Sequence, residues 1–220
     1  MKKRTAILGG YDTAAHGWTL AACKLGDPEQ KTEYTEKPGG DGAWDISTVL
    51  TGGIPRYKNR PLNITLECSE GTRDDREDLI NELVNSLDGL ENKIVLPDRP
   101  EHYLYGRLHI AVDRSTLAHA IVNITGTMEP WYYKERETIV EIDATEYPQE
   151  HWLENNGRRA VVPVLSTDGS IQVTYKGVAA NLDAGNAYQW PALLLTPGLH
   201  TIDVSGTGRL TVTYREAVLR

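Results

Sequence analysis

The chain has 220 residues, of which 40% are hydrophobic and 25% are charged, so it can build one large or two small globular cores. Its formal net charge is −8, because 31 Asp and Glu outnumber 23 Lys and Arg. This acidic balance argues against general or sequence-specific nucleic-acid binding, which needs clustered cations to neutralise phosphates.

The N-terminus is basic, but the apolar run that follows it, residues 6–8, is too short for a secretory signal. No later run approaches the roughly 20 apolar residues of a membrane helix. We therefore expect a protein that is made in a cytoplasm and is at first soluble there. The two cysteines, Cys23 and Cys68, have no CxxC spacing, which is typical of free thiols.

Alternating apolar residues predict half-buried strands over residues 60–68 and 103–112. The side chains on the expected core faces are Leu62, Ile64, Leu66, Cys68, Leu104, Leu108, Ile110 and Val112. A similar alternation continues through residues 122–128 and 138–142.

One clear helix is predicted between the first two strands, over residues 72–89. Thr72 is the expected N-cap, acidic residues crowd the first turns where the helix dipole favours them, and Gly89 supplies the stop. The apolar stripe consists of Leu79, Ile80, Leu83, Val84 and Leu87. The acidic cluster is typical of a capped, solvated helix face, and we favour that interpretation over a metal site.

The strand pattern lapses over residues 144–159, where we place a domain boundary. The prediction is an N-terminal domain of residues 1–145 and a C-terminal domain of residues 146–220. In the second domain, short apolar runs separated by turn residues predict an antiparallel β-sandwich. These runs are residues 161–165, 171–175, 192–195, 201–204 and 210–214.

The last two runs flank a Ser-Gly-Thr-Gly segment, residues 205–208. Glycine pairs can cradle phosphate, but a phosphate loop leads into a helix whose N-terminal amides meet the anion. Here Leu210, Val212 and Tyr214 alternate with threonines, which predicts a strand. We therefore interpret residues 205–208 as a hairpin turn that binds nothing.

No residue pattern predicts catalysis, a metal site or a cofactor. The six histidines form no compact ligand pair such as HExxH, and no Gly-x-Ser-x-Gly elbow is present. With 31 acidic residues, a carboxylate pair carries no information. We predict that the protein is not an enzyme and that it has no catalytic, cofactor-binding or metal-ligating residues.

Four aromatic residues lie in or near the C-terminal strands: Trp152, Tyr175, Tyr188 and Trp190. Aromatic side chains on the surface of a sandwich can stack on sugar rings, which would make this domain a carbohydrate-binding host-adhesion module. Because the chain contains no Phe, the same residues are needed to fill a core, and we favour that interpretation.

Taken in order, these motifs resemble the distal tail protein family of long, flexible-tailed (siphovirus-type) bacteriophages, a tail-tip and baseplate family. The resemblance includes Tyr103, Tyr105, Gly106 and Arg107, and the acid-Pro-aromatic stretch at residues 129–133. It also includes residues 191–215, where Pro-Gly and Ser-Gly-x-Gly precede an alternating strand and Tyr-Arg. It covers nearly the whole chain, and the ordered set is more specific than any single motif.

The resemblance implies a mainly β fold. The N-terminal part would be a ring-forming β-sandwich with one α-helix, related to tail-tube proteins, and the C-terminal part a galectin-like antiparallel β-sandwich. The protein would be synthesised in the host bacterial cytoplasm and would become a structural, non-catalytic part of the virion at the distal end of the phage tail. Six copies would form a hexameric ring that joins the tail tube to the baseplate and host-adsorption apparatus around the DNA channel.

The partners that this resemblance implies are further copies of the chain, the tail-tube protein, the tape-measure protein and the tail-associated lysin or baseplate hub. In some relatives a receptor-binding protein is added, and no membrane partner is implied. Two alternatives stay open: the carbohydrate-binding module above, and a tail-tube or other baseplate component with the same ring-forming fold. The source could be an infectious phage, a prophage or a tail-like bacteriocin.

A ring requires one surface of each copy to meet a different surface of the next. We interpret residues 45–58 as a hairpin that reaches a neighbouring subunit, with Arg56, Tyr57 and Lys58 at its basic tip as candidate interface residues. An ordinary solvated hairpin is the alternative interpretation.

Overall fold

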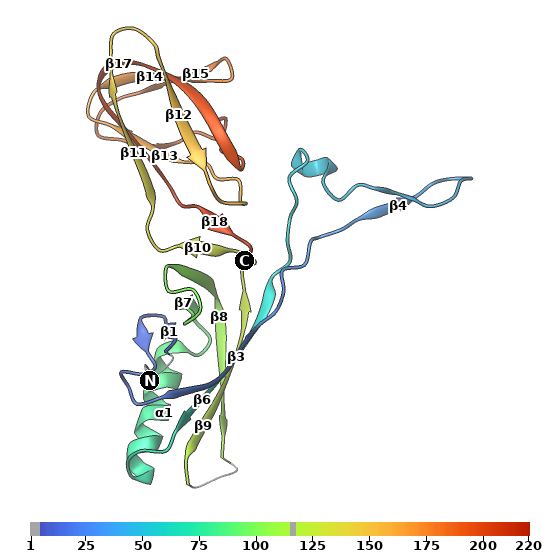
Figure 1. The fold of residues 1–220 in the computed structure, drawn as a ribbon, viewed down its shortest axis with the longest axis vertical. Helices are drawn as coiled ribbons and strands as arrows, with labels where there is room; N and C mark the ends of the chain where they lie inside the picture. Colours follow the sequence, from blue (N-terminus) through green and yellow to red (C-terminus); the bar gives the residue numbers. More distant parts are fainter. Residues whose placement is uncertain (1–4, 115–117) are drawn as a thin grey trace. The chain divides into compact units, whose positions relative to one another are not determined.

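The structure is a computed structural model that describes residues 5–114 and 118–220, and within them the chain is mainly β with one α-helix (Figure 1). It forms two compact units, Met1–Pro130 and Trp131–Arg220, each built on antiparallel strands. The fold class expected from the sequence is therefore confirmed. No described helix is long and apolar enough to cross a membrane.

The first unit is built around one antiparallel sheet. Its strands are β1 (Ile7–Leu8), β2 (Tyr11–Asp12), β3 (Thr19–Leu25), β4 (Tyr34–Glu36), β5 (Ala43–Asp45), β6 (Arg60–Cys68), β7 (Glu91–Val95), β8 (His102–Asp113) and β9 (Ala120–Met128). Seven of them pair in the order β2-β1-β7-β8-β9-β6-β3, while β4 pairs with β5. The predicted alternation is confirmed, since Leu62, Leu66 and Leu108 are buried on the core face of the sheet.

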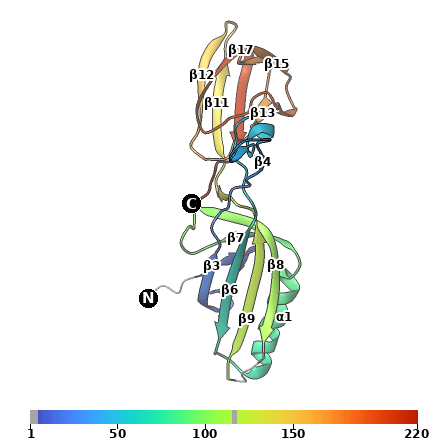
Figure 2. The same ribbon diagram turned by 90° about the vertical axis from the view of Figure 1, so that its right-hand side faces the viewer.

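The single described α-helix, α1 (Arg73–Leu87), packs against β8 and β9 (Figure 2). It buries Ile80, Leu83 and Leu87. Its first turn has the predicted cap, because the Asp75 N–H donates to Thr72 Oγ1 and the Thr72 N–H donates to Asp75 Oδ2. Asp75 Oδ2 accepts hydrogen bonds from the Thr72 N–H and from the Thr72 hydroxyl, and these two bonds hold the pKa of Asp75 below its ordinary value.

The second unit is a sandwich of two layers. Its strands are β10 (Tyr132–Lys134), β11 (Thr138–Ala144), β12 (Gln149–Asn155), β13 (Val164–Thr167), β14 (Ser170–Tyr175), β15 (Val178–Leu182), β16 (Ala187–Gln189), β17 (Gly198–Tyr214) and β18 (Ala217–Val218). One layer has the order β12-β17-β14-β15 and the other β11-β17-β13-β16, so β17 belongs to both. Between the layers lies a core that includes Leu153, Leu165, Val173, Leu193 and Val212.

The second unit begins earlier than the boundary predicted at residue 145. Strand β11 pairs with β17 from Thr138↔Tyr214 to Ala144↔Gly208, and Ile142 lies in the core of the second unit. Apolar and polar residues alternate over residues 138–144 as they do in the preceding strands. This alternation predicts a strand but not which sheet the strand joins, so the predicted boundary lies too late in the chain.

The Ser-Gly-Thr-Gly segment is not the predicted hairpin turn. Strand β17 runs through it without a break, pairing with β12 and β14 before it and with β11 and β13 after it. Ile202 and Val204 before the segment and Leu210 after it all point into the core. The two glycines continue this inward row, with φ of 129° at Gly206 and 103° at Gly208.

These glycines let the strand pass from one layer to the other, because a residue with a side chain at either position would clash with neighbouring parts of the chain. A Cβ on Gly206 would lie 2.3 Å from the carbonyl oxygen of Ser170, and one on Gly208 would lie 2.5 Å from Asp168 Oδ1. The absence of side chains therefore allows the start of β14 and the turn before it, residues 168–171, to approach the bend closely.

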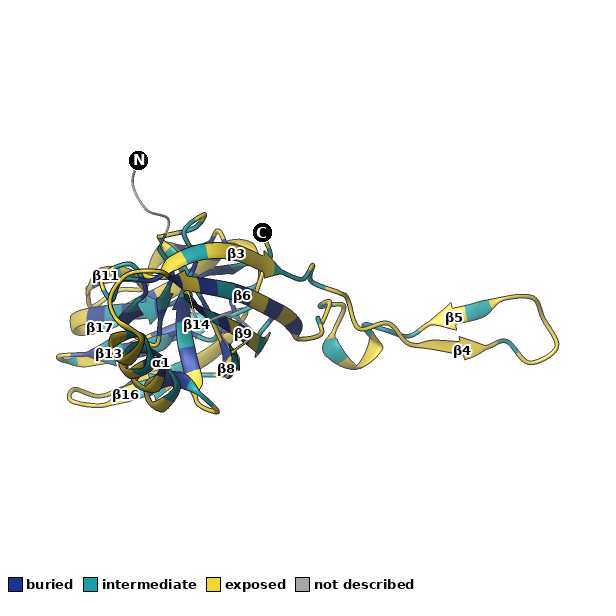
Figure 3. Ribbon diagram, turned by 90° about the horizontal axis from the view of Figure 1, so that it is seen from below, coloured by how far each residue is buried: buried dark blue, intermediate teal, exposed yellow. Residues whose placement is uncertain are grey.

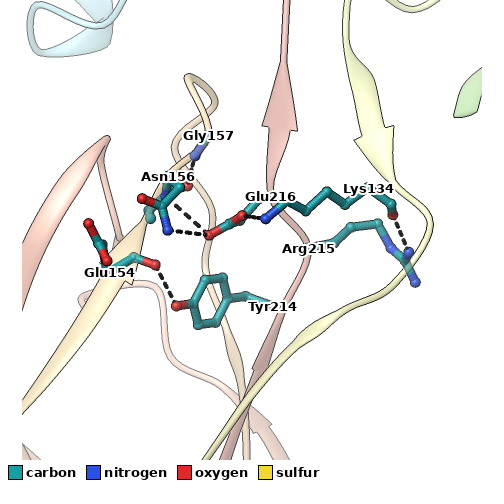
Figure 4. A network of polar contacts seen from close by, with 8 residues as sticks. Lys134, Glu154, Asn156, Gly157, Tyr214, Arg215 and Glu216 are labelled. Atoms are coloured by element: carbon teal, nitrogen blue, oxygen red, sulfur yellow. Dashed lines mark hydrogen bonds and ion pairs between the residues drawn. The ribbon is translucent and has the colours of Figure 1, made fainter. Parts of the chain in front are cut away.

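A polar network ties the end of the chain to β10 and to the turn after β12 (Figure 4). Glu216 is buried, contacts the Lys134 ammonium and accepts a hydrogen bond of 3.1 Å from the Asn156 N–H. Burial alone raises the pKa of Glu216, but the hydrogen bonds from Lys134 and Asn156 outweigh it and hold that pKa below its ordinary value. The network therefore stabilises the fold when Glu216 is ionised.

The bend in β17 can be tested by adding a single methyl group. We expect Gly206→Ala to lower the free energy of unfolding by about 3 kcal/mol, because it combines an unfavourable φ with a backbone clash. Gly198→Ala is the matched control on the same strand: its φ is 110°, but its Cβ would meet nothing within 4 Å, so the loss is about 1 kcal/mol. Denaturant unfolding measures both values, and equal losses would contradict the close approach at Gly206.

The Glu216 network predicts a pH-dependent stability. Because the folded pKa of Glu216 lies below the unfolded value, its contribution is present above about pH 4.3 and is lost as the pH falls through the folded pKa. We expect Glu216→Gln to lower the free energy of unfolding by about 2 kcal/mol at neutral pH, and by less in acid. Exposed Glu146→Gln is the control. A loss that is constant across this pH range would rule out the ionised network.

Candidate assembly surface

The longest connection in the first unit is a projecting segment that contributes nothing to the core. Residues 27–59, which we name the arm, join β3 to β6, and β4 and β5 form its outer part (Figure 3). None of these residues is buried. The arm is therefore a structured segment whose folding is not explained by burial within its own chain.

The two ends of the arm are held together by the sheet. Strands β3 and β6 are antiparallel neighbours, with Leu25 opposite Leu62, and the Gly26 N–H donates to the Pro61 carbonyl at 2.8 Å. Beyond this base, two backbone hydrogen bonds of 2.8 Å, from Lys31 to Arg56 and from Lys58 to Glu29, keep the outgoing and returning segments paired. The arm is thus a very long hairpin connection between two paired strands.

The turn of this hairpin differs in position from the one expected over residues 45–58. It lies at residues 37–42, between β4 and β5, while Arg56, Tyr57 and Lys58 lie on the returning segment near the base. Gly39, Gly40 and Gly42 lie in this turn, and Gly52 and Gly53, both with positive φ, follow the short 3-10 helix Val49–Thr51. The interface role of Arg56, Tyr57 and Lys58 stays a prediction.

One charge of the predicted basic tip has a partner within the arm itself. The Lys58 ammonium lies 3.1 Å from Glu29 Oε2, and both side chains are largely exposed. Such an exposed pair contributes little to stability, so Lys58 remains accessible to another protein.

Large apolar side chains on the arm are exposed to solvent, which the sequence analysis did not anticipate. They are Tyr34, Trp44, Val49 and Leu50, and Leu50 is 95% exposed. The register pairs Tyr34 with Asp45 and Thr35 with Trp44, so the two aromatic side chains lie on opposite faces of the β4-β5 ribbon. Both faces of the arm therefore offer apolar surface to a partner.

The sheet of the first unit has an open edge beside the arm. Among the described strands, β3 is the last in the order and pairs on one side, with β6, while most of its side chains are exposed. The strand at the other end, β2, has two residues. Strand β3 thus presents the longer row of backbone groups to which a further strand could pair.

The other residues singled out from the sequence belong to other segments of the chain. Tyr175 is buried in the core of the second unit, and Tyr188 and Trp190 pack against it, while Trp152 is 66% exposed. The cysteines are free thiols, as predicted. Across residues 5–114 and 118–220, no three His, Cys, Asp or Glu side chains are grouped so that they could hold a metal ion.

Comparison with known proteins gives a likeness of fold. No protein-family model and no curated protein matches the sequence. The crystal structure of the Dit protein of phage SPP1, described as a paradigm of the hub adsorption apparatus in phages that infect Gram-positive bacteria, matches with a TM-score of 0.69 and 14% identity. The match covers 97% of this chain and 99% of that one.

Two structures of the phage p2 baseplate in its activated conformation, with Sr and with Ca, match with TM-scores of 0.43. Their identities to this chain are 8% and 9%, over 96% and 97% of this chain and 98% of theirs, and these scores are too low to carry an argument. The SPP1 match confirms, at the level of the fold, the resemblance that the motifs indicated. This chain has the fold of the phage tail protein Dit over nearly its whole length.

Proposed function

We propose that this protein is a structural component of a bacteriophage or prophage tail tip, and that it forms a hexameric ring. The ring joins the tail tube to the baseplate and host-adsorption apparatus around the DNA channel. The observation that carries the proposal is the likeness to SPP1 Dit, which extends through both units and leaves almost no part of either chain unmatched.

The arm supports assembly with further copies of the chain. A two-stranded hairpin is at best marginally stable in water on its own, and this one also exposes Trp44 and Leu50. Covering these side chains removes apolar surface from water and stabilises both the arm and the contact. A second copy is the partner that a ring supplies at every position.

The geometry suits contact between unlike surfaces. In a ring, the arm of one copy packs on the first unit of the next, and a closing rotation ends the series. The open edge of β3 offers backbone hydrogen bonds to an added strand, and Arg56 and Lys58 at the base of the arm offer positive charge. The expectation that six copies form the ring comes from the family resemblance.

This role is structural and requires no catalysis, metal or cofactor. The partners that follow from it are the tail-tube protein on one side of the ring and the baseplate hub or tail-associated lysin on the other. The tape-measure protein passes through the channel, and a receptor-binding protein docks on the periphery in some assemblies. The mature location is the distal end of the tail in the virion.

Deleting the arm tests the proposal directly. The change replaces residues 27–59 with a two-residue turn between Gly26 and Arg60, which the β3-β6 pairing already holds close together. Because no arm residue is buried, we expect the unfolding temperature to change by no more than about 2 °C. Negative-stain imaging and mass measurement at high protein concentration should show six-fold rings for the full chain and monomers for the deletion variant.

Point variants locate the contact on the arm. We expect Trp44→Ala and Leu50→Ser each to weaken ring association about tenfold or more, because exposed apolar anchors dominate such interfaces. Tyr147→Ser is the matched control, since Tyr147 is 75% exposed in the second unit.

Other outcomes would support other functions. A full chain that stacks into long tubes by itself would point to a tail-tube component, and a permanent monomer that binds glycans would point to an adhesion module. Rings of unchanged size and strength from the deletion variant would contradict the role of the arm.

A further inference from the structure

A second surface, on the second unit, has chemistry that the ring does not use. It lies on the outward side of the β12-β17 pair and consists of Glu150, Trp152, Glu154, Leu199 and Asp203, which we name the acidic face. Trp152 and Leu199 are 66% and 64% exposed, and the three carboxylates are exposed as well.

The strand register places these side chains next to one another. Across β12 and β17, Glu150 is opposite Asp203, and Glu154 is opposite Leu199. Trp152 is opposite Thr201, so Leu199 and Asp203 are its two diagonal neighbours on β17. The indole therefore lies in the middle of the face, with carboxylates on both sides along its own strand.

The negative charges of this face are not neutralised within the part of the chain that the structure describes. Among the described residues, no cation forms an ion pair with Glu150, Glu154 or Asp203, and Glu150 accepts a hydrogen bond of 3.2 Å from Trp152 Nε1. The ammonium of Lys176, in the turn after β14, lies instead over the ring of Tyr175. Like charges placed directly opposite each other, as in Glu150 and Asp203, destabilise a strand pair.

The outward side of the other layer shows a different arrangement. There Glu141 and Asp143 lie on β11, and Arg209 on β17 contacts them at 3.2 Å and 2.8 Å. Hydrogen bonding to Asp143, together with both negative charges, raises the pKa of Arg209. In that layer, Arg209 thus neutralises the outward carboxylates of Glu141 and Asp143. Within residues 5–114 and 118–220, the carboxylates of the acidic face have no such cation and are open to one from a partner.

We propose that the acidic face binds a basic, extended segment of another protein. A lysine or arginine side chain of that segment lies over the Trp152 ring, where the face of the indole attracts a cation. The flanking carboxylates of Glu150 and Asp203 contact the same charge, and Leu199 packs against an apolar neighbour. A neutral sugar could stack on Trp152 but would leave the three carboxylates without a counter-charge.

The test uses the full chain and a ten-residue peptide that alternates lysine with threonine, compared with the same peptide carrying glutamine for lysine. Calorimetry should detect binding of the lysine peptide alone, weakening as salt is raised. We expect Trp152→Ala, and Glu150→Gln combined with Asp203→Asn, each to raise the Kd about tenfold. The matched controls should bind as the unchanged protein does: Ile139→Ala, an exposed apolar residue of the other layer, and Glu67→Gln combined with Glu101→Gln.

A stability measurement separates binding from a structural role. Because Glu150 and Asp203 repel each other, we expect Glu150→Gln to raise the unfolding temperature by roughly 1–2 °C while it weakens peptide binding. No binding of the lysine peptide, or equal weakening by the face and control variants, would overturn the proposal. Binding of a neutral chitin oligosaccharide that Trp152→Ala abolishes would assign the face to a glycan instead.

Discussion

The pairing of β3 with β6 is the constraint from which the proposed assembly follows. This pairing fixes the two ends of the arm at one point, since the Gly26 N–H donates to the Pro61 carbonyl where the strands meet. Everything between these residues can then project from the sheet without disturbing it. Residues 27–59 are ordered although none of them is buried, so the apolar side chains of the arm stay open to contact with another molecule.

The second unit depends on a comparable device, a single strand shared by two layers. Strand β17 holds β12 and β14 in one layer and β11 and β13 in the other, so its bend sets the spacing of the whole sandwich. The bend is possible because Gly206 and Gly208 leave the inward row empty where residues 168–171 approach it. The two outward sides of the sandwich differ in charge, since Arg209 pairs with the carboxylates of one and the acidic face lies on the other.

Local patterns in the sequence predicted the local structure well. The cap at Thr72, the stripe ending at Leu87 and the alternation in β6 are all confirmed, because each depends on neighbours within a few residues. The course of β17 and the start of the second unit could not be predicted, because they depend on which distant strands pair. The glycine pair at residues 206 and 208 is compatible both with a hairpin turn and with a bend inside one strand, so the local sequence did not distinguish the two.

The sequence analysis predicted a projecting hairpin at residues 45–58, but for a different reason it missed the full extent of the arm and its exposed apolar side chains. A regular spacing of apolar residues arises where a strand or helix buries one face within its own chain. Trp44 and Leu50 are exposed in the single chain, so the sequence around them has no such spacing and resembles a loop. Trp152 was noted among four aromatic residues, yet no pattern distinguished it from Tyr175, which fills the core. Residues that contact other molecules have no local signature until the fold shows what their own chain leaves uncovered.

The central claim is that the arm of one copy packs on the next copy, and crosslinking between labelled chains tests it most directly. A photo-reactive analogue of leucine, which keeps the apolar side chain, replaces Leu50, and nitrogen-15-labelled and unlabelled chains are mixed in equal amounts before assembly and irradiation. The account predicts crosslinked peptides of mixed isotope composition that join position 50 to residues of the first unit of another chain. Crosslinks found only within single chains, in assembled rings, would contradict it.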